Sequence, residues 1–137
     1  MRTWLLSLSD EECYRLLSES RLGRMAVIYE GRPEIFPVVY SFDLANRTVS
    51  FPTFDGTKLH GALGWPTVAF EVDGMEDGEE RGWSVVVHGR AELVVDEAET
   101  KRLASSRSVA WRNEPTVRWL RITPDRVSGR RILAAPE

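Results

Sequence analysis

The sequence has one cysteine, Cys13, and only two histidines, His60 and His88, among its 137 residues. A single cysteine excludes an intramolecular disulfide, and the two isolated histidines do not make a recognisable set of zinc ligands. We therefore expect no metal site and a chain that suits a reducing compartment.

The chain also lacks a long hydrophobic run and an excess of basic residues. The apolar stretch at residues 4–6 is too short for the core of a signal peptide, and no later stretch approaches membrane-spanning length. Eighteen basic residues against 21 acidic ones give a formal net charge of −3, which argues against nonspecific nucleic-acid binding. We expect a cytoplasmic protein that binds neither membrane nor nucleic acid.

The composition, 42% hydrophobic and 28% charged, is that of an ordinary globular protein. A chain of this length makes one domain, residues 1–137, and buries enough surface to need no disulfide or metal for its core. Charge is spread unevenly, with ten acidic and two basic residues at 71–99 but nine basic and three acidic at 101–137. Two solvated faces explain this; a basic C-terminal segment that meets an anionic ligand or an acidic partner surface is the sharper alternative.

The first predicted element is a helix. Ser9 and Glu12 form a capping box, and Cys13, Leu16 and Leu17 recur at helical spacing on one apolar face that ends near Ser20. We expect Cys13 to be buried and unreactive.

After Gly23 the pattern becomes that of strands with short connections, which favours an antiparallel meander. Pro37 predicts a sheet edge, a bulge or an opening of the sheet, and Gly89 predicts a bend or bulge in its strand. Residues 73–81 are predicted to form an acidic loop. Small helices are expected at 58–63 and from Asp96 to Ser105. The fold is therefore mainly β, a closed or nearly closed antiparallel barrel of six or seven strands, at residues 24–29, 35–42, 48–51, 67–72, 83–95, 117–122 and 127–133.

The Gly-Thr-Lys turn at residues 56–58 offers backbone N–H groups, a hydroxyl and an ammonium at the start of a helix, a combination that suits a phosphate. It is not a Walker loop, because the second glycine is missing. Taken alone, the motif is weak, and an N-cap threonine with a solvated lysine is the favoured explanation. Ser84 has no Ser-His-Asp partners, which argues against a hydrolase.

Four motifs follow one another along the chain: G-R-P-E-I-F-P-V, then G-T-K, A-F-E-V-D and G-W-S-V-V-V-H-G-R-A. In this order, from about Ser9 to Ile132, the chain resembles the pyridoxamine 5'-phosphate oxidase-like family of flavin-binding split barrels. The resemblance implies a split β-barrel with small peripheral helices, and a homodimer that holds two cofactors in its interface.

The resemblance also implies a role for particular residues in binding flavin mononucleotide (FMN). The strand of Pro37, Val38, Val39 and Tyr40 would lie along the isoalloxazine ring, and Trp83 and Ser84 would approach from the neighbouring wall. Four residues would face the ribityl phosphate: Phe51, Thr53, Thr57 and Lys58. Two more, Trp111 and Arg112, would close the pocket from the partner subunit.

One departure from the family pattern concerns the phosphate. Many relatives have arginine where this chain has Pro52, and proline supplies neither a bidentate donor nor a backbone N–H. Lys58 is then the main cation of the motif, with Arg24, Arg112 or another arginine as helpers. Weaker FMN binding, or the deazaflavin coenzyme that some relatives use, follows as an alternative.

The leading functional hypothesis is a flavin-dependent oxidoreductase acting on an unknown small molecule, since the cofactor would carry the redox chemistry and no side-chain triad is visible. A deazaflavin-dependent reductase and a non-catalytic flavin-binding or sensing protein are the alternatives, with a haem-binding relative as a third. Pyridoxamine phosphate oxidase activity is not expected, because the chain is short for that enzyme and its pyridoxal phosphate-binding residues have no match here.

Overall fold

The computed structural model describes residues 3–54, 56, 61–76, 81–106 and 117–134. These residues form an eight-stranded sheet, every ladder of which is antiparallel, and small helices. In chain order the elements are β1 (Thr3–Ser7), α1 (Asp10–Glu19), β2 (Leu22–Tyr29), β3 (Arg32–Val39), β4 (Ser41–Asp43), β5 (Thr48–Thr53), β6 (Val68–Glu76), β7 (Arg81–Leu93), α3 (Glu97–Ser106) and β8 (Arg118–Ala134), and residues 61–63 are also helical.

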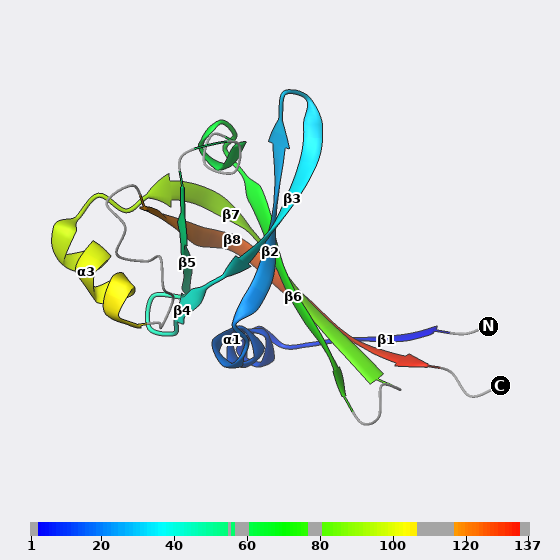
Figure 1. The fold of residues 1–137 in the computed structure, drawn as a ribbon. Coiled ribbons are helices and arrows are strands. Elements are labelled where there is room, and N and C mark those ends of the chain that lie inside the picture. Colours follow the sequence, from blue (N-terminus) through cyan, green and yellow to red (C-terminus); the bar gives the residue numbers. More distant parts are fainter. Residues whose placement is uncertain (1–2, 55, 57–60, 77–80, 107–116, 135–137) are drawn as a thin grey trace.

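The strands are ordered β3-β2-β6-β7-β8-β5-β4, and β1 adds to the second half of β8. Figure 1 shows the sheet curled around the core, with β6, β7, β8 and β1 extending beyond it toward the two chain ends. No ladder joins β3 to β4 in the described part of the chain, so the sheet is not closed. The mainly β split barrel with small helices is confirmed, with one strand more than the upper expectation.

The long β7–β8 hairpin is the central element of the fold. Its ladder runs from Arg81 opposite Leu133 to Leu93 opposite Leu120, with one shift in register between His88 and Gly89. A Cβ atom at Gly89 would stand 2.2 Å from the carbonyl oxygen of Thr123, so only glycine fits this close approach. The predicted bend at Gly89 is confirmed as a bulge that lets the strand curl.

Helix α1 forms where its capping box predicts. The Ser9 side chain accepts a hydrogen bond from the Glu12 amide, and the apolar side chains at positions 13, 16 and 17 are buried. A Cβ atom at Gly129 would lie 2.5 Å from Cys13 Sγ, so the helix rests directly on β8. Burial, followed by the charges of Asp10 and Glu12, raises the pKa of Cys13, which keeps the thiol protonated.

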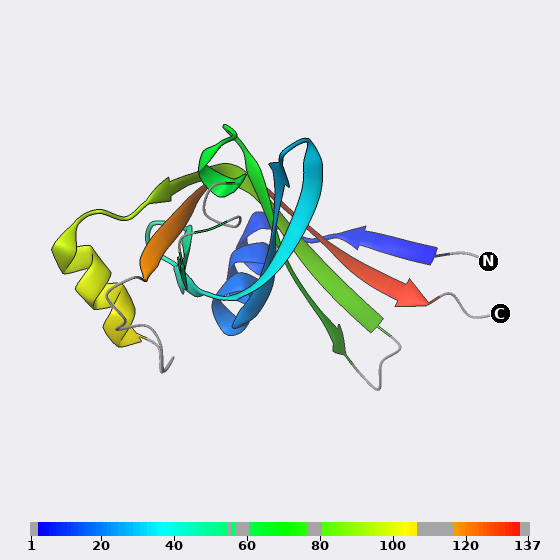
Figure 2. The ribbon, with the colours of Figure 1, turned by 45° about the horizontal axis from the view of Figure 1, so that its top comes forward.

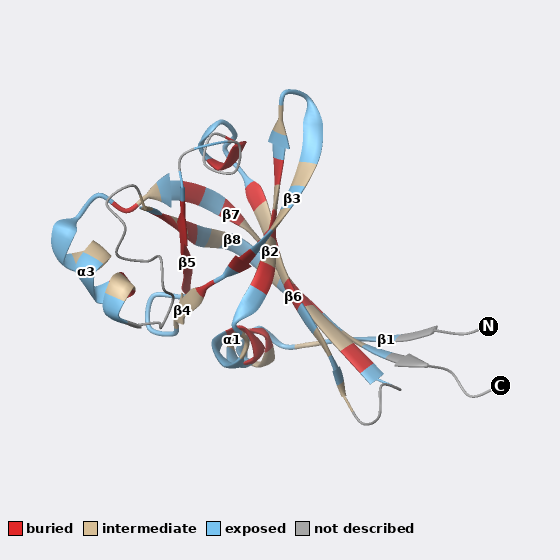
Figure 3. Cartoon of the chain, in the orientation of Figure 1, coloured by how far each residue is buried: buried red, intermediate tan, exposed pale blue. Residues whose placement is uncertain are grey.

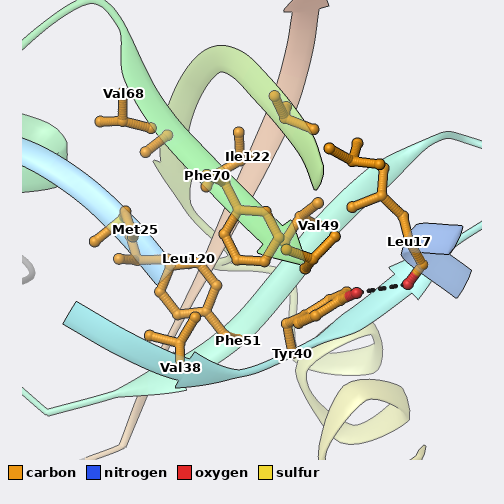
Figure 4. Close-up of a cluster of buried hydrophobic side chains, with 14 of the residues drawn as sticks. Leu17, Met25, Val38, Tyr40, Val49, Phe51, Val68, Phe70, Leu120 and Ile122 are labelled. Carbon is orange, nitrogen blue, oxygen red and sulfur yellow. Dashed lines mark hydrogen bonds between the residues drawn. The ribbon is translucent and has the colours of Figure 1, made fainter. Parts of the chain in front are cut away.

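The main core fills the inside of the curled sheet and the space under α1. Tyr40 is fully buried there; its hydroxyl donates to the Leu17 carbonyl at 2.6 Å, and its ring meets the edge of Phe70 (Figure 4). This contact ties α1 to the break between β3 and β4. Strand β5 is buried along its whole length (Figure 3).

Helix α3 lies apart from α1, beyond β5 (Figure 2). Asp96 caps it, as predicted, by accepting the Glu99 amide at 3.0 Å, and Leu103 packs in a small second core with Val94 and Trp119. Pro52 is paired with Trp119 on this side of the sheet.

Three sequence predictions need correction. The strand expected at 35–42 breaks at Tyr40 into β3 and β4, whereas those at 117–122 and 127–133 form the single strand β8. The acidic segment expected as a loop from residue 73 continues β6 to Glu76, because pairing with β7 outweighs the poor strand propensity of its acidic residues. The short terminal strand β1 was not foreseen. Pro37 does lie on an edge strand, since β3 pairs only with β2 among the described strands.

No helix within the described residues is long and apolar enough to cross a membrane.

The core contact of Phe70 gives a test of the fold. Phe70→Ala removes a fully buried ring and should cost about 3–5 kcal/mol in the free energy of unfolding, measured by denaturant titration. Val95→Ala, at a side chain that is 87% exposed, is the control and should change it by no more than about 0.5 kcal/mol. Equal effects of the two substitutions would contradict the core assignment.

Candidate functional site: an uncovered sheet face

One face of the sheet is not covered by any described helix or strand. Side chains alternate along each strand, and directly paired residues share a face, so the ladders define which residues lie together. In β7, Val85 and Val87 point into the core while Ser84 and Val86 point away from it. We call the side that points away from the core the outer face. It is formed by β3, β2, β6, β7, β8 and β1. Strand by strand it carries Ile35, Pro37 and Val39; Leu22, Arg24, Ala26 and Ile28; Ala69, Glu71, Asp73 and Met75; Gly82, Ser84, Val86 and His88; Arg126, Ser128, Arg130 and Ile132; and Leu5 and Ser7.

Large apolar side chains are exposed on this outer face. Ile35 is 67% exposed, Met75 60% and Leu22 54%. Leu5 and Ile132 are cross-strand partners, and Gly82 continues their row to Met75. Contiguous exposed apolar surface of this kind marks an interaction or ligand-binding surface rather than an ordinary solvated face.

A charged cluster lies within the same face. Arg24 Nη1 donates to Glu71 Oε1 at 2.9 Å and to Asp73 Oδ2 at 3.1 Å, so one guanidinium bridges two carboxylates of β6. Burial and the hydrogen bond and charge of Asp73 raise the pKa of Glu71 from 4.5 to about 7, against the opposing charge of Arg24. The outer face therefore holds a carboxyl group that changes charge near neutral pH.

The strand predicted to lie along a flavin ring presents only half of its side chains to the outer face. Pro37 and Val39 are exposed there. Val38 and Tyr40 point the other way and are buried in the core (Figure 4). A ligand on the outer face would therefore meet the side chains of Pro37 and Val39 but only the backbone of Val38.

The residues predicted near the ribityl phosphate are divided between the core and the part of the chain that is not described. Phe51 is fully buried in the core (Figure 4), and Thr53 is buried with its hydroxyl donating to the Phe54 carbonyl at 3.2 Å. The other two predicted phosphate residues, Thr57 and Lys58, lie outside the described residues. So do Trp111 and Arg112, which were predicted to close the pocket. Their roles stay predictions.

Trp83 and Ser84 lie on opposite faces of β7. Ser84 is on the outer face, paired with Asp73 on one side and Arg130 on the other. Trp83 faces α1 and lines a pocket of about 350 Å³ together with Arg15, Leu16, Glu19, Ser20, Glu76 and Arg131. Arg131 and Glu76 form an ion pair at 3.1 Å there. Among the described site residues, Ser84 thus shares its face with Pro37 and Val39, whereas Trp83 does not.

The remaining polar residues of the outer face were not predicted as a group. His88 Nδ1 lies 3.3 Å from Arg126 Nη2, which makes it a hydrogen-bonded strand histidine. The Arg24 cluster and Arg130 were missed as face residues. The alternation of A-F-E-V-D signalled that Glu71 and Asp73 share a side, but only the ladder with β2 brings Arg24 between them.

The fold is that of a split-barrel protein with an uncovered sheet face. Residues 9–131 match the family model described as pyridoxamine 5'-phosphate oxidase. The chain belongs to this family, which confirms the resemblance drawn from its motifs.

Solved structures and a curated relative agree with this assignment. The FAD-binding protein from Mycobacterium smegmatis is 35% identical, with 95% of this chain and 100% of that chain covered and a TM-score of 0.80. An FAD-binding protein from Mesorhizobium loti is 27% identical over 97% of this chain and 100% of that chain, with a TM-score of 0.83. An uncharacterized protein of Mycobacterium tuberculosis is 33% identical over 91 residues, 66% of this chain and 81% of its own length.

The titration of Glu71 gives a pH-dependent prediction. Because its folded-state pKa lies above the ordinary value of 4.5, its stabilising contribution is complete below pH 4.5 and is lost as pH rises through about 7. Glu71→Gln cannot titrate, so its free energy of unfolding should rise relative to the parent protein between pH 5 and pH 8. The gain should be about 1 kcal/mol, since solvent screens a partly exposed carboxylate. Denaturant titrations at both pH values measure it, and a constant difference would contradict the raised pKa.

Proposed function

We propose that this chain is a flavin-binding protein that holds its cofactor against the outer face, under a second copy of itself. The observation that carries the proposal is a coincidence of two independent sets of residues. The exposed apolar side chains Ile35 and Leu22 lie beside Pro37 and Val39, which the family resemblance assigns to the flavin ring, and Ser84 lies on the same face.

The outer face suits a flavin in its chemistry. An isoalloxazine is a flat ring with apolar edges and polar ring atoms, and an edge strand with Pro37 and Val39 exposed gives it an apolar surface to lie on. Ser84 supplies a hydroxyl on the same face. Relatives that cover almost the whole chain are named as FAD-binding proteins, which supports a flavin over the deazaflavin coenzyme.

A second copy of the chain is the proposed cover. The family resemblance implies a homodimer with the cofactor in its interface, and the apolar part of the outer face offers what such an interface buries. A stable dimer needs about 800 Å² of surface from each partner. Six strands contribute to the outer face, so the surface on offer is broad rather than a single groove.

The proposed activity is redox chemistry on a small molecule. A bound flavin supplies electron or hydride transfer, while the residues of this chain bind the ring, orient it and exclude water. In this arrangement β3 holds one side of the ring, and the Arg24 cluster keeps the adjacent part of the face polar and charged.

The first experiment is an absorbance spectrum of the purified protein before and after addition of FMN and FAD, with any bound cofactor identified by mass and the oligomeric state measured by light scattering. Saturable uptake of one flavin per chain by a dimer is expected. A monomer that takes up neither flavin would overturn the proposal, and turnover with a reduced nicotinamide donor separates an enzyme from a binding protein.

Ile35→Glu tests the cover. It places a charge in the apolar part of the outer face, where burial under a partner would cost several kcal/mol. We expect the dimer to dissociate at least tenfold more readily and flavin affinity to fall with it. Val95→Glu, at an exposed position outside this face, is the matched control. If both variants stay dimeric and bind flavin alike, this face is not the interface.

Lys58→Ala tests the phosphate assignment carried by the Gly-Thr-Lys motif. Loss of the ammonium should weaken FMN binding about tenfold, because a charge-assisted hydrogen bond to phosphate is lost. Riboflavin, which has no phosphate, should bind the variant and the parent protein equally. Unchanged FMN affinity in fluorescence titrations would remove the phosphate role of Lys58.

A further inference from the structure

The outer face carries three arginines, and two of them are already engaged. Arg24 is held by Glu71 and Asp73 at ion-pair distance. Arg126 lies against His88. Arg130 is exposed and has no acidic side chain within ion-pair distance among the described residues. Arg130 is therefore the arginine of this face that has neither an ion pair nor a side-chain hydrogen bond among the described residues, so it is available to a ligand.

The surroundings of Arg130 are rich in hydrogen-bond donors. The ladders place it directly opposite Ser84 on β7 and Ser7 on β1, and Ser128 stands two residues earlier on the same side of β8. A guanidinium flanked by hydroxyl groups is a donor set that matches the oxygens of a phosphate. The carboxylate of Asp73, beyond Ser84, accepts a hydrogen bond from Arg24 and forms no ion pair with Arg130.

This donor set lies far along β8 from the part of the strand that pairs with β5. Thr53 is paired with Arg118 at the start of β8, and Arg130 stands twelve positions further along the same strand. At about 3.3 Å per residue this is on the order of 40 Å of strand. The Arg130 donor set therefore lies toward the opposite end of β8 from the residue that pairs with Thr53.

We propose that Arg130, with Ser7 and Ser128 beside it, anchors a phosphate group of the flavin nucleotide on the outer face. The inference rests on the proposed flavin function and adds the contact that fixes the phosphate. It gives a role to an arginine of the basic C-terminal segment, residues 101–137.

Arg130→Ala and a matched control test this anchor. Affinities for riboflavin, FMN and FAD are measured by fluorescence titration for the parent protein, Arg130→Ala, Arg130→Lys and Arg131→Ala. Arg131 is the adjacent arginine but faces α1 and the Trp83 pocket, so its loss tests the opposite side of the sheet. Circular dichroism melts check that each variant is folded.

Arg130→Ala should weaken FAD binding about tenfold or more and leave riboflavin binding unchanged, because riboflavin has no phosphate. Arg130→Lys should recover part of the loss, since it keeps the charge without the planar fork. The FMN affinity identifies the phosphate: a loss equal to that for FAD places the ribityl phosphate at Arg130, and a loss for FAD alone places the phosphate next to the adenosine there.

Two results would overturn the anchor. Equal FMN and FAD affinities in Arg130→Ala and the parent protein would show that no flavin phosphate meets this side chain. A loss in Arg131→Ala with none in Arg130→Ala would move the nucleotide to the pocket beside Trp83. Failure of the parent protein to bind any flavin is a different outcome, because it would overturn the proposed function together with the anchor.

Discussion

The antiparallel ladder between β7 and β8 is the constraint on which the other elements depend. Strands β6, β5 and β1 all add to one of these two strands, and α1 rests on β8 at Gly129. The bulge at Gly89 curls the hairpin into the barrel, while the straight half beyond it extends toward the chain ends. Because this ladder keeps one register from residue 81 to residue 88, it also decides which side chains form the core and which form the outer face.

This alternation divides residues that a motif treats as one group. In a strand, neighbouring side chains point to opposite faces, so a contiguous motif cannot present all of its side chains to one ligand. Val38 and Tyr40 are buried in the core, whereas Pro37 and Val39, which alternate with them along the chain, are exposed. In the same way Trp83 faces α1 while Ser84 faces outward. Part of such a motif therefore positions the strand, and the other part makes the binding surface.

Much of the fold follows from local patterns in the sequence. The capping box at Ser9 predicts α1 because its hydrogen bonds join residues only three positions apart. The continuous strand β8 could not be predicted, because Pro124 reads as a break. The structure places Pro124 opposite Gly89 at the bulge, where a missing N–H disturbs the ladder least. Strand β1 is held by long-range pairing with the end of β8, which no local pattern reveals.

The site was harder to predict than the fold for the same reason. Pro37, Val39 and Ser84 came from motif order, but their shared face depends on the ladders that join β3 to β2, β2 to β6 and β6 to β7. The Arg24 bridge depends on this register as well, since its partners are 47 and 49 positions away in the sequence. Sequence spacing alone carries no information on which two strands become neighbours.

The charges of the outer face respond together to whatever covers it. The Arg24 cluster, one guanidinium beside two carboxylates, carries a net negative charge. A partner surface that excludes water raises the free-energy cost of keeping this charge. A proton on Glu71, whose pKa is already about 7, makes the Arg24 cluster neutral. A phosphate bound at Arg130 would act in the same direction, because its negative charge disfavours a further anion on the same face. Covering the face, binding a nucleotide and protonating Glu71 therefore favour one another, and the binding of an anionic flavin should take up a fraction of a proton near neutral pH.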